Sequence, residues 1–200
     1  MLISFEGIDG CGKSTQIEKL KSYFSNNGIV HHVFREPGGT EISEKIRSLL
    51  LHESTEMDPV TELLLFSAAR SQLISEKITP ILNRGEIVIL DRFFDSTTAY
   101  QGYGRESGDI EQIEALNRIA TKSTVPDLTF YLRTTPEIAS QRTAKSQKDR
   151  MENSGFEFFK KVVKGYDEIA SKEERFVIIE AGKSIDQIHQ QIVDVISQKL

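Results

Sequence analysis

The sequence has few cysteines and no long apolar run, which argues against a secreted or membrane-spanning protein. Cys11 is the only cysteine among its 200 residues, so no disulfide can form within the chain, as is usual in a reducing cytosol. No apolar run approaches the roughly 20 residues that cross a bilayer. The apolar start, residues 1–5, is too short for a signal peptide, and Glu6 and Asp9 follow it directly. We therefore expect a soluble, cytoplasmic protein with no membrane partner.

The chain also lacks an excess of positive charge. Its formal net charge is −5, so the field of the whole molecule does not favour binding of nucleic acid. A local basic site for a small anion is still compatible with this value. Hydrophobic residues make up 38% and charged residues 28%, a balance typical of globular proteins, and 200 residues suffice for one sizeable core. We expect a single domain over residues 1–200.

Short apolar segments alternate with longer amphipathic ones along the chain. The apolar segments predict strands over residues 2–6, 30–34, 86–90, 128–132 and 176–179. The amphipathic segments predict helices over residues 14–25, 41–51, 60–83, 110–121, 156–171 and 185–200. Such alternation is typical of an α/β fold, so we expect five largely parallel strands in one sheet with helices on both faces.

A glycine-rich segment, GIDGCGKST, joins the first expected strand to the first expected helix and matches the pattern G-x-x-x-x-G-K-[ST]. Glycines let backbone N–H groups point inward around a phosphate, and the following helix adds its positive end. This strand–loop–helix context favours a P-loop NTPase fold over an ordinary glycine-rich turn. The predicted ATP-binding residues are Gly7, Ile8, Asp9, Gly10, Cys11, Gly12, Lys13, Ser14 and Thr15.

Charged residues elsewhere suit the same phosphate chemistry. Asp91 ends a buried strand, and together with the Ser14 hydroxyl it is expected to hold Mg²⁺. Arg92 is expected to point into the same crevice. The polar segment 141–154 is expected to be a mobile lid whose cations close over phosphates, although a solvated loop is the alternative. Its cations are Arg142, Lys145, Lys148 and Arg150.

Two further segments are ambiguous by themselves. Phe66 and Arg70 are four residues apart on an expected helix and so share a face, where they could stack on a base and bind its edge. Spacing alone favours the plainer interpretation of a core phenylalanine beside a solvated arginine. The segment REPGGT, residues 35–40, places Glu36 at the sheet edge but is otherwise typical of a polar turn.

Taken together, these segments resemble the thymidylate kinase family of P-loop nucleoside monophosphate kinases. The resemblance covers essentially the whole chain and is carried by FEGIDGCGKST, REPGGT, LLLFSAAR, DRFFDSTTAYQGYGR, PDLTFYL and DRME. It implies a homodimer that transfers a phosphoryl group from ATP to dTMP in the presence of Mg²⁺, giving ADP and dTDP. The chain is similar to the bacterial type, whose arginines lie in the lid.

The resemblance also implies individual roles. Phe66 would stack on thymine, Arg70 would donate to its O4 atom, and Tyr100 would crowd the sugar 2′ position. The complete dTMP-binding set is Asp9, Glu36, Arg47, Phe66, Arg70, Arg92, Thr97, Tyr100 and Gln101. The residues expected to act in the transfer are Asp9, Lys13, Arg92, Arg142 and Arg150.

Two other functions fit part of the pattern. A deoxynucleoside kinase would share the P-loop and use Glu36 as a general base toward a hydroxyl acceptor. Arg47 and Arg92 argue against it, because a neutral nucleoside needs fewer cations. A regulatory P-loop ATPase would need an exposed apolar surface for a partner protein, and we expect 200 residues to leave little room for such an output.

Overall fold

The computed structural model describes residues 1–51, 56–144 and 150–200. Within them a five-stranded sheet has the order β2-β3-β1-β4-β5, and every neighbouring pair is parallel. The strands are β1 (Leu2–Glu6), β2 (His31–Arg35), β3 (Ile87–Asp91), β4 (Leu128–Arg133) and β5 (Phe176–Glu180). The predicted strands agree with these bounds to within one residue, and the predicted parallel α/β sheet is confirmed.

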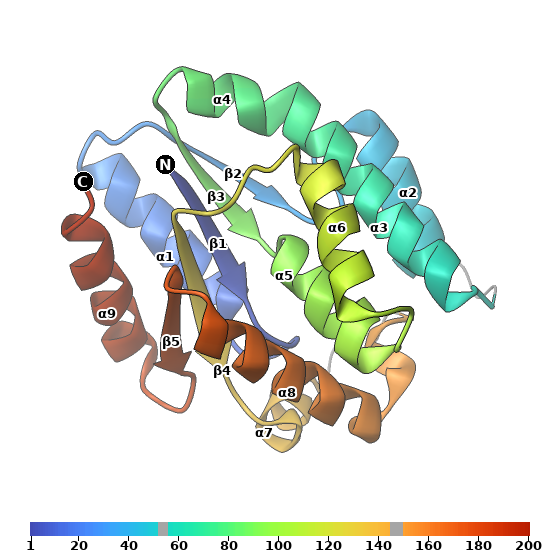
Figure 1. Ribbon diagram of the computed structural model, residues 1–200. Coiled ribbons are helices and arrows are strands. Elements are labelled where there is room, and N and C mark those ends of the chain that lie inside the picture. Colours follow the sequence, from blue (N-terminus) through green and yellow to red (C-terminus); the bar gives the residue numbers. More distant parts are fainter. Residues whose placement is uncertain (52–55, 145–149) are drawn as a thin grey trace.

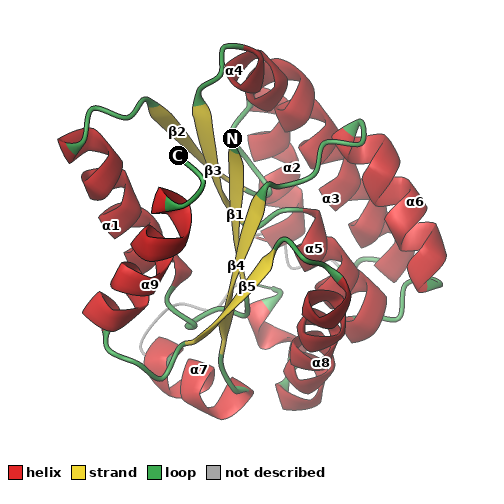
Figure 2. Cartoon of the chain, turned by 60° about the vertical axis from the view of Figure 1, so that its left-hand side comes forward, coloured by secondary structure: helices red, strands yellow, loops and turns green. Residues whose placement is uncertain are grey.

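Helices cover both faces of the sheet. They are α1 (Lys13–Asn26), α2 (Glu41–Leu51), α3 (Pro59–Leu73), α4 (Thr79–Asn83), α5 (Phe94–Thr97), α6 (Ile110–Thr121), α7 (Pro136–Thr143), α8 (Phe156–Lys172) and α9 (Ile185–Ser197). Two π-helical segments, η1 (Ile74–Ile78) and η2 (Thr98–Gly104), and a 3₁₀ turn, η3 (Glu152–Ser154), complete the described elements. Figure 2 shows α1 and α9 on one side of the sheet and α3, α6 and α8 on the other.

Strands β1 and β3 are buried on both faces because helices cover both faces of the sheet. In β1, Ile3 and Phe5 pack in a core cluster with residues of α1 and α9, whereas Leu2 packs in another with residues of α3, η1 and α4. Successive strand residues point to opposite faces, so each core receives alternate side chains. Core clusters thus pack against both faces of the sheet. They fix the carboxyl ends of the strands, where ligand sites lie in such folds.

Four short helical segments, α5, η2, α7 and η3, were not predicted from the sequence. The expected helix 60–83 is interrupted by η1 without a break in the chain, and α5 with η2 forms a run that the sequence did not reveal. The segment η2, TAYQGYG, has poor helix formers, and its packing against α8 overrides that preference. A Cβ atom on Gly104 would come within 2.6 Å of the Phe158 ring, so glycine allows this close approach.

The third unpredicted helix is α7. Its start has a recognisable signal, because the Thr135 side chain accepts a hydrogen bond from the Ile138 amide and Pro136 occupies the first turn. Residues 141–143 therefore belong to a helix and not to the expected loop. Residues 145–149, with Lys145 and Lys148, lie outside the described residues.

The carboxyl ends of the parallel strands meet at one edge of the sheet, the usual position of ligand sites in such folds. Figure 1 shows the loop after β1 at this edge, beside the ends of β3 and β4. In the described part of the chain, no helix is both long and apolar enough to span a membrane.

Candidate active site

The loop after β1 has the backbone that its glycines predict. Gly7, Gly10 and Gly12 have φ values of 130°, 82° and 106°, in the left-handed region that disfavours other residues. A Cβ atom on Gly10 would also lie 2.6 Å from the Ala139 carbonyl oxygen of α7. The loop turns directly into α1, so the free amides at the start of this helix face the same space.

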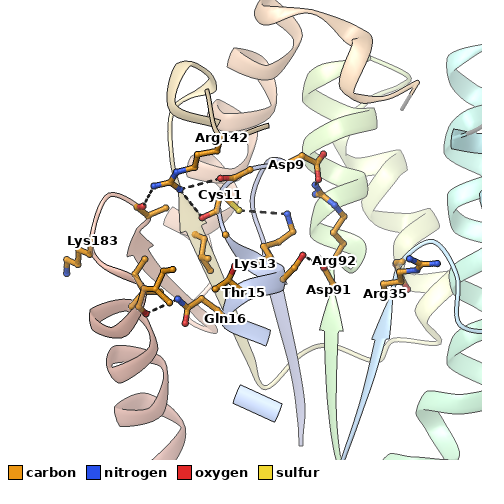
Figure 3. A pocket seen from close by; sticks show the side chains of 18 of the residues that line it. Asp9, Cys11, Lys13, Thr15, Gln16, Arg35, Asp91, Arg92, Arg142 and Lys183 are labelled. Atoms are coloured by element: carbon orange, nitrogen blue, oxygen red, sulfur yellow. Dashed lines mark hydrogen bonds and ion pairs between the residues drawn. The ribbon is translucent and has the colours of Figure 1, made fainter. Parts of the chain in front are cut away.

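A cavity of about 530 Å³ lies over this loop (Figure 3). Lys13 is almost fully buried there, and its ammonium group donates to the Gly7 and Ile8 carbonyl oxygens at 3.0 and 3.3 Å. Of the predicted ATP-binding residues, Asp9, Gly10, Cys11, Gly12, Lys13, Ser14 and Thr15 line the cavity. Gly7 and Ile8 support it through their carbonyl groups.

Two oxygen donors at the floor of this cavity suit a magnesium ion. The Ser14 hydroxyl lies 3.5 Å from a carboxylate oxygen of Asp91 at the end of β3. Mg²⁺ prefers oxygen ligands and is usually held by one or two protein groups together with phosphate oxygens and water. No group of three or more His, Cys, Asp or Glu residues forms a metal site among the described residues.

Arg142 reaches the cavity from α7. Its guanidinium donates to the Ala181 carbonyl oxygen at 2.8 Å, and more weakly to those of Gly10 and Cys11 at 3.3 and 3.5 Å (Figure 3). It therefore links α7, the glycine-rich loop and the segment after β5. Sequence reasoning missed Ala181 and Lys183 of this segment, although their place just after a strand is a usable signal.

Arg92 stands between this cavity and a second one. Its backbone has a φ of 71°, unusual for a residue other than glycine, and its guanidinium donates to Asp9 at 2.8 Å and to the Tyr100 hydroxyl at 3.0 Å. Burial alone would raise the pKa of Asp9, but the charges of Arg92 and Lys13 outweigh it and lower that pKa to about 2. The pair is thus an ionised carboxylate beside a fixed cation.

Behind Arg92 lies a carboxylate to which the sequence analysis gave no role. Glu6 is fully buried at the end of β1 and accepts hydrogen bonds from the Phe93 amide, the Ser96 hydroxyl and the Tyr166 hydroxyl at 2.6–2.8 Å. Burial raises the pKa of Glu6 to about 7, and the nearby Asp95 adds to this. Because Phe93 follows Arg92 directly, these bonds hold the backbone that carries the arginine.

The second cavity, of about 100 Å³, adjoins the first and collects residues from distant parts of the sequence. Every residue predicted to bind dTMP lines it, namely Asp9, Glu36, Arg47, Phe66, Arg70, Arg92, Thr97, Tyr100 and Gln101. The cavity is also lined by residues that the sequence did not point to, namely Pro37, Leu51, Phe93, Ser96 and Met151. We call this the acceptor cavity and the larger one the donor cavity.

Arg70 is not the solvated flank that its spacing alone favoured. Its side chain is 2% exposed, and its Nε atom donates to Glu36 at 2.7 Å while Nη1 lies 3.3 Å from the Asn117 amide oxygen. Burial raises the pKa of Glu36, although the charge of Arg70 opposes this. The other Glu36 oxygen, Oε1, has no hydrogen-bond partner among the described residues.

Arg150 lies apart from the phosphate-binding loop. It donates from Nε to the Leu50 carbonyl oxygen at 2.7 Å and from Nη2 to a carboxylate oxygen of Glu62 at 2.5 Å. It lines neither the donor cavity nor the acceptor cavity, whereas its neighbour Met151 lines the latter. The structure thus brings together the predicted site residues except Arg150.

Comparison with known proteins decides the family. The thymidylate kinase family model matches residues 5–192. The chain belongs to the thymidylate kinase family. Thymidylate kinase of Thermoanaerobacter sp. (strain X514) is 46% identical over 199 residues, which cover 99% of this chain and 98% of the relative. Thymidylate kinase of Chlorobaculum tepidum is 49% identical over 207 residues, covering 98% and 96%.

A solved structure agrees with this membership. The crystal structure of thymidylate kinase from Ehrlichia chaffeensis matches with a TM-score of 0.78 at 35% identity, and the match covers 98% of each chain. The predicted thymidylate kinase family and P-loop NTPase fold are therefore confirmed. The deoxynucleoside kinase alternative is not favoured, because these relatives are all named thymidylate kinases.

Proposed function

We propose that the chain transfers the γ-phosphoryl group of ATP to dTMP, giving ADP and dTDP. The observation that carries this proposal is that the donor and acceptor cavities adjoin and share lining residues. The shared residues are Asp9, Glu36, Arg47 and Arg92. Two anionic substrates can meet at such a junction only if cations lie between them, and two of the four shared residues are arginines.

The donor cavity has the groups that a triphosphate needs. The backbone amides of residues 7–15 and the Lys13 ammonium would bind the phosphates, and Ser14 and Asp91 would hold Mg²⁺. The bound ion would neutralise charge on the phosphate oxygens. Arg142 is fixed by three carbonyl oxygens above the loop, so we assign it to the donor side.

The acceptor cavity has the groups that a pyrimidine monophosphate needs. Arg92 and Arg47 would bind the acceptor phosphate, while Phe66 would stack on the base and Arg70 would donate to it. Phosphoryl transfer depends on alignment and charge neutralisation more than on covalent work by side chains. The acceptor phosphate is already anionic, so Glu36 has no proton to remove and serves to hold Arg70.

An acceptor panel tests this proposal. ADP release with Mg·ATP is measured for dTMP, dUMP, dCMP, dAMP, dGMP, UMP and free thymidine. We expect fast turnover with dTMP, weaker turnover with dUMP and little with the others. Turnover of thymidine without turnover of dTMP would contradict the proposal and return Glu36 to the role of general base.

We also propose that the chain forms a homodimer. Helix α3 packs between α2 and α6, and the outward surface of these three helices carries exposed apolar side chains. Ile42, Leu64 and Ile119 are 51%, 51% and 74% exposed. Light scattering on the eluting protein should give twice the mass of 22.6 kDa, and Leu64→Glu should lower it to that of one chain. A monomeric parent protein would overturn this assignment.

A further inference from the structure

A buried carboxylate outside both cavities pairs with side chains from two parts of the chain, Gln101 and Arg105 at η2 and Arg150 before η3. Glu62 of α3 is 1% exposed. Its Oε1 atom accepts from Gln101 Nε2 at 2.9 Å and lies 3.4 Å from Arg105 Nε, and its Oε2 atom accepts from Arg150. None of the roles proposed above uses Glu62. Charged side chains are rarely buried this deeply unless ion pairs and hydrogen bonds compensate for the loss of water.

The position of Glu62 connects it to the acceptor cavity. Glu62, Phe66 and Arg70 are spaced four residues apart on α3, so they share one face of the helix. Phe66 and Arg70 line the acceptor cavity, and Gln101 of η2 lines it as well. Glu62 therefore lies behind the base-binding side of the cavity, and its carboxylate contacts the lining residue Gln101.

The contact fixes which way the Gln101 amide points. A carboxylate offers only acceptors, so the NH₂ group of the amide must face Glu62 and the carbonyl oxygen must face away from it. No described residue donates a hydrogen bond to that carbonyl oxygen. Gln101 is itself 1% exposed, and the opposite orientation would set its carbonyl oxygen against the Glu62 carboxylate with no hydrogen between them.

Two arginines keep the carboxylate in place. Arg105 also donates to the Ser154 hydroxyl at 2.8 Å, and its guanidinium lies 4.6 Å from the centre of the Phe158 ring. Arg150 also donates to a backbone carbonyl oxygen of α2 at 2.7 Å. The carboxylate is held from both sides, so it cannot turn away to release the amide.

We propose that Glu62 is a positioning residue that sets pyrimidine specificity by fixing the amide of Gln101. The acceptor cavity then presents an amide oxygen from Gln101 and an N–H donor from Arg70. Thymine has the complementary edge, an N3–H donor beside the O4 acceptor, whereas cytosine has an acceptor at N3 and a donor at N4. A cytosine monophosphate would leave buried polar groups unpaired. This inference rests on the proposed function of the acceptor cavity.

The direct test is Glu62→Gln, which keeps the size of the side chain but offers both a donor and an acceptor to Gln101. The ratio of kcat/KM for dTMP to kcat/KM for dCMP is measured in the parent and the variant. We expect the ratio to fall at least about tenfold in E62Q. This is the scale of discrimination that one correctly oriented pair of hydrogen bonds to a base provides. A merely structural role would lower both values together and leave the ratio unchanged.

A double-mutant cycle shows whether Glu62 acts through Gln101. Gln101→Met removes the amide, so E62Q should cause no further loss of selectivity in the Q101M background. A loss that persists in that background would overturn the proposal. Ser154→Ala is the matched control, because it removes a partner of Arg105 in the same cluster without touching Gln101. It should keep the parent ratio.

A second measurement covers the case in which E62Q does not fold. In the parent protein, the ¹⁵N-labelled side-chain amide of Gln101 is assigned by its loss in Q101M. Its N–H groups should exchange slowly with solvent before any nucleotide is added, and rapid exchange would overturn the proposal. Failure of the parent to phosphorylate dTMP would overturn the proposed function itself, whereas dTMP turnover with an unchanged E62Q ratio would overturn only the role of Glu62.

Discussion

The donor and acceptor cavities are built in opposite ways. The donor cavity forms around one continuous segment, residues 7–15, whose shape follows from glycines and the start of a helix. The acceptor cavity draws on the ends of β2 and β3, on α3 and on η2, and buried groups such as Arg70 and Glu36 hold it together. Binding of phosphate needs backbone amides and one lysine, whereas recognition of a base needs side chains that other buried side chains have already oriented.

The largest effect should come from the donor side. Lys13→Met removes the only lysine of the loop, and kcat should fall by about 10³-fold because charge on the transferring group loses its partner. Binding of dTMP should not change. Steady-state kinetics check the first statement and calorimetry the second. Lys21→Met on the outer surface of α1 is the matched control and should behave like the parent.

The junction between the cavities should give the next largest effect. Arg92→Gln removes one of the two arginines that line both cavities, so we expect kcat to fall by about 10²-fold and KM for dTMP to rise. Arg133→Gln, at the end of β4 and half exposed, tests the loss of an arginine from the same sheet edge and should change neither value. A normal kcat with a raised KM would mean that Arg92 only binds the acceptor.

Glu6 offers a test through stability. Its folded-state pKa of about 7 is above the ordinary 4.5, because burial favours the neutral form. Its contribution to the free energy of unfolding is therefore complete below pH 4.5 and is lost as the pH rises through 7. At about 1.4 kcal/mol per unit, the loss reaches about 3 kcal/mol.

Urea unfolding at several pH values checks this prediction. The parent protein should lose stability between pH 5 and 8 relative to Glu6→Gln, which carries no titrating group. Glu180→Gln, at the exposed end of β5, should keep the pH dependence of the parent. If the free energy of unfolding of the parent and of E6Q changed equally with pH, Glu6 would not titrate as described. The backbone next to Arg92 would then not be held by a buried carboxyl group with a raised pKa.

The same contrast explains how much the sequence revealed. The strands, most helices and the phosphate loop follow from periodicity and from a local motif, because the residues that form them are neighbours in the chain. Spacing alone misjudged Arg70, whose burial depends on Glu36 and Asn117 far away in the sequence. The family resemblance, and not the spacing, placed it at the base.

Other parts of the site had no local signal. The π-helical segment η2 forms although its two glycines have low helix propensity. It can pack closely on α8 because Gly104 leaves room for Phe158 and Gly165 leaves room for Tyr103. The partners of Glu6 are distant in the sequence, at positions 93–166. Arg150 was expected among the phosphates, but its partner Glu62 lies on α3. Pairing between buried charges depends on the complete fold, so a single sequence does not reveal it.

The division of work between the two cavities is the central claim, and calorimetric titration of Phe66→Ala tests it most directly. Phe66 lines only the acceptor cavity, so its loss should weaken dTMP binding by about tenfold, the scale of one stacked base, and leave Mg·ATP binding unchanged. Lys13→Met should show the reverse pattern. An equal loss of both ligands in Phe66→Ala would contradict the claim that, apart from the four residues that line both cavities, each substrate is bound by its own set of residues.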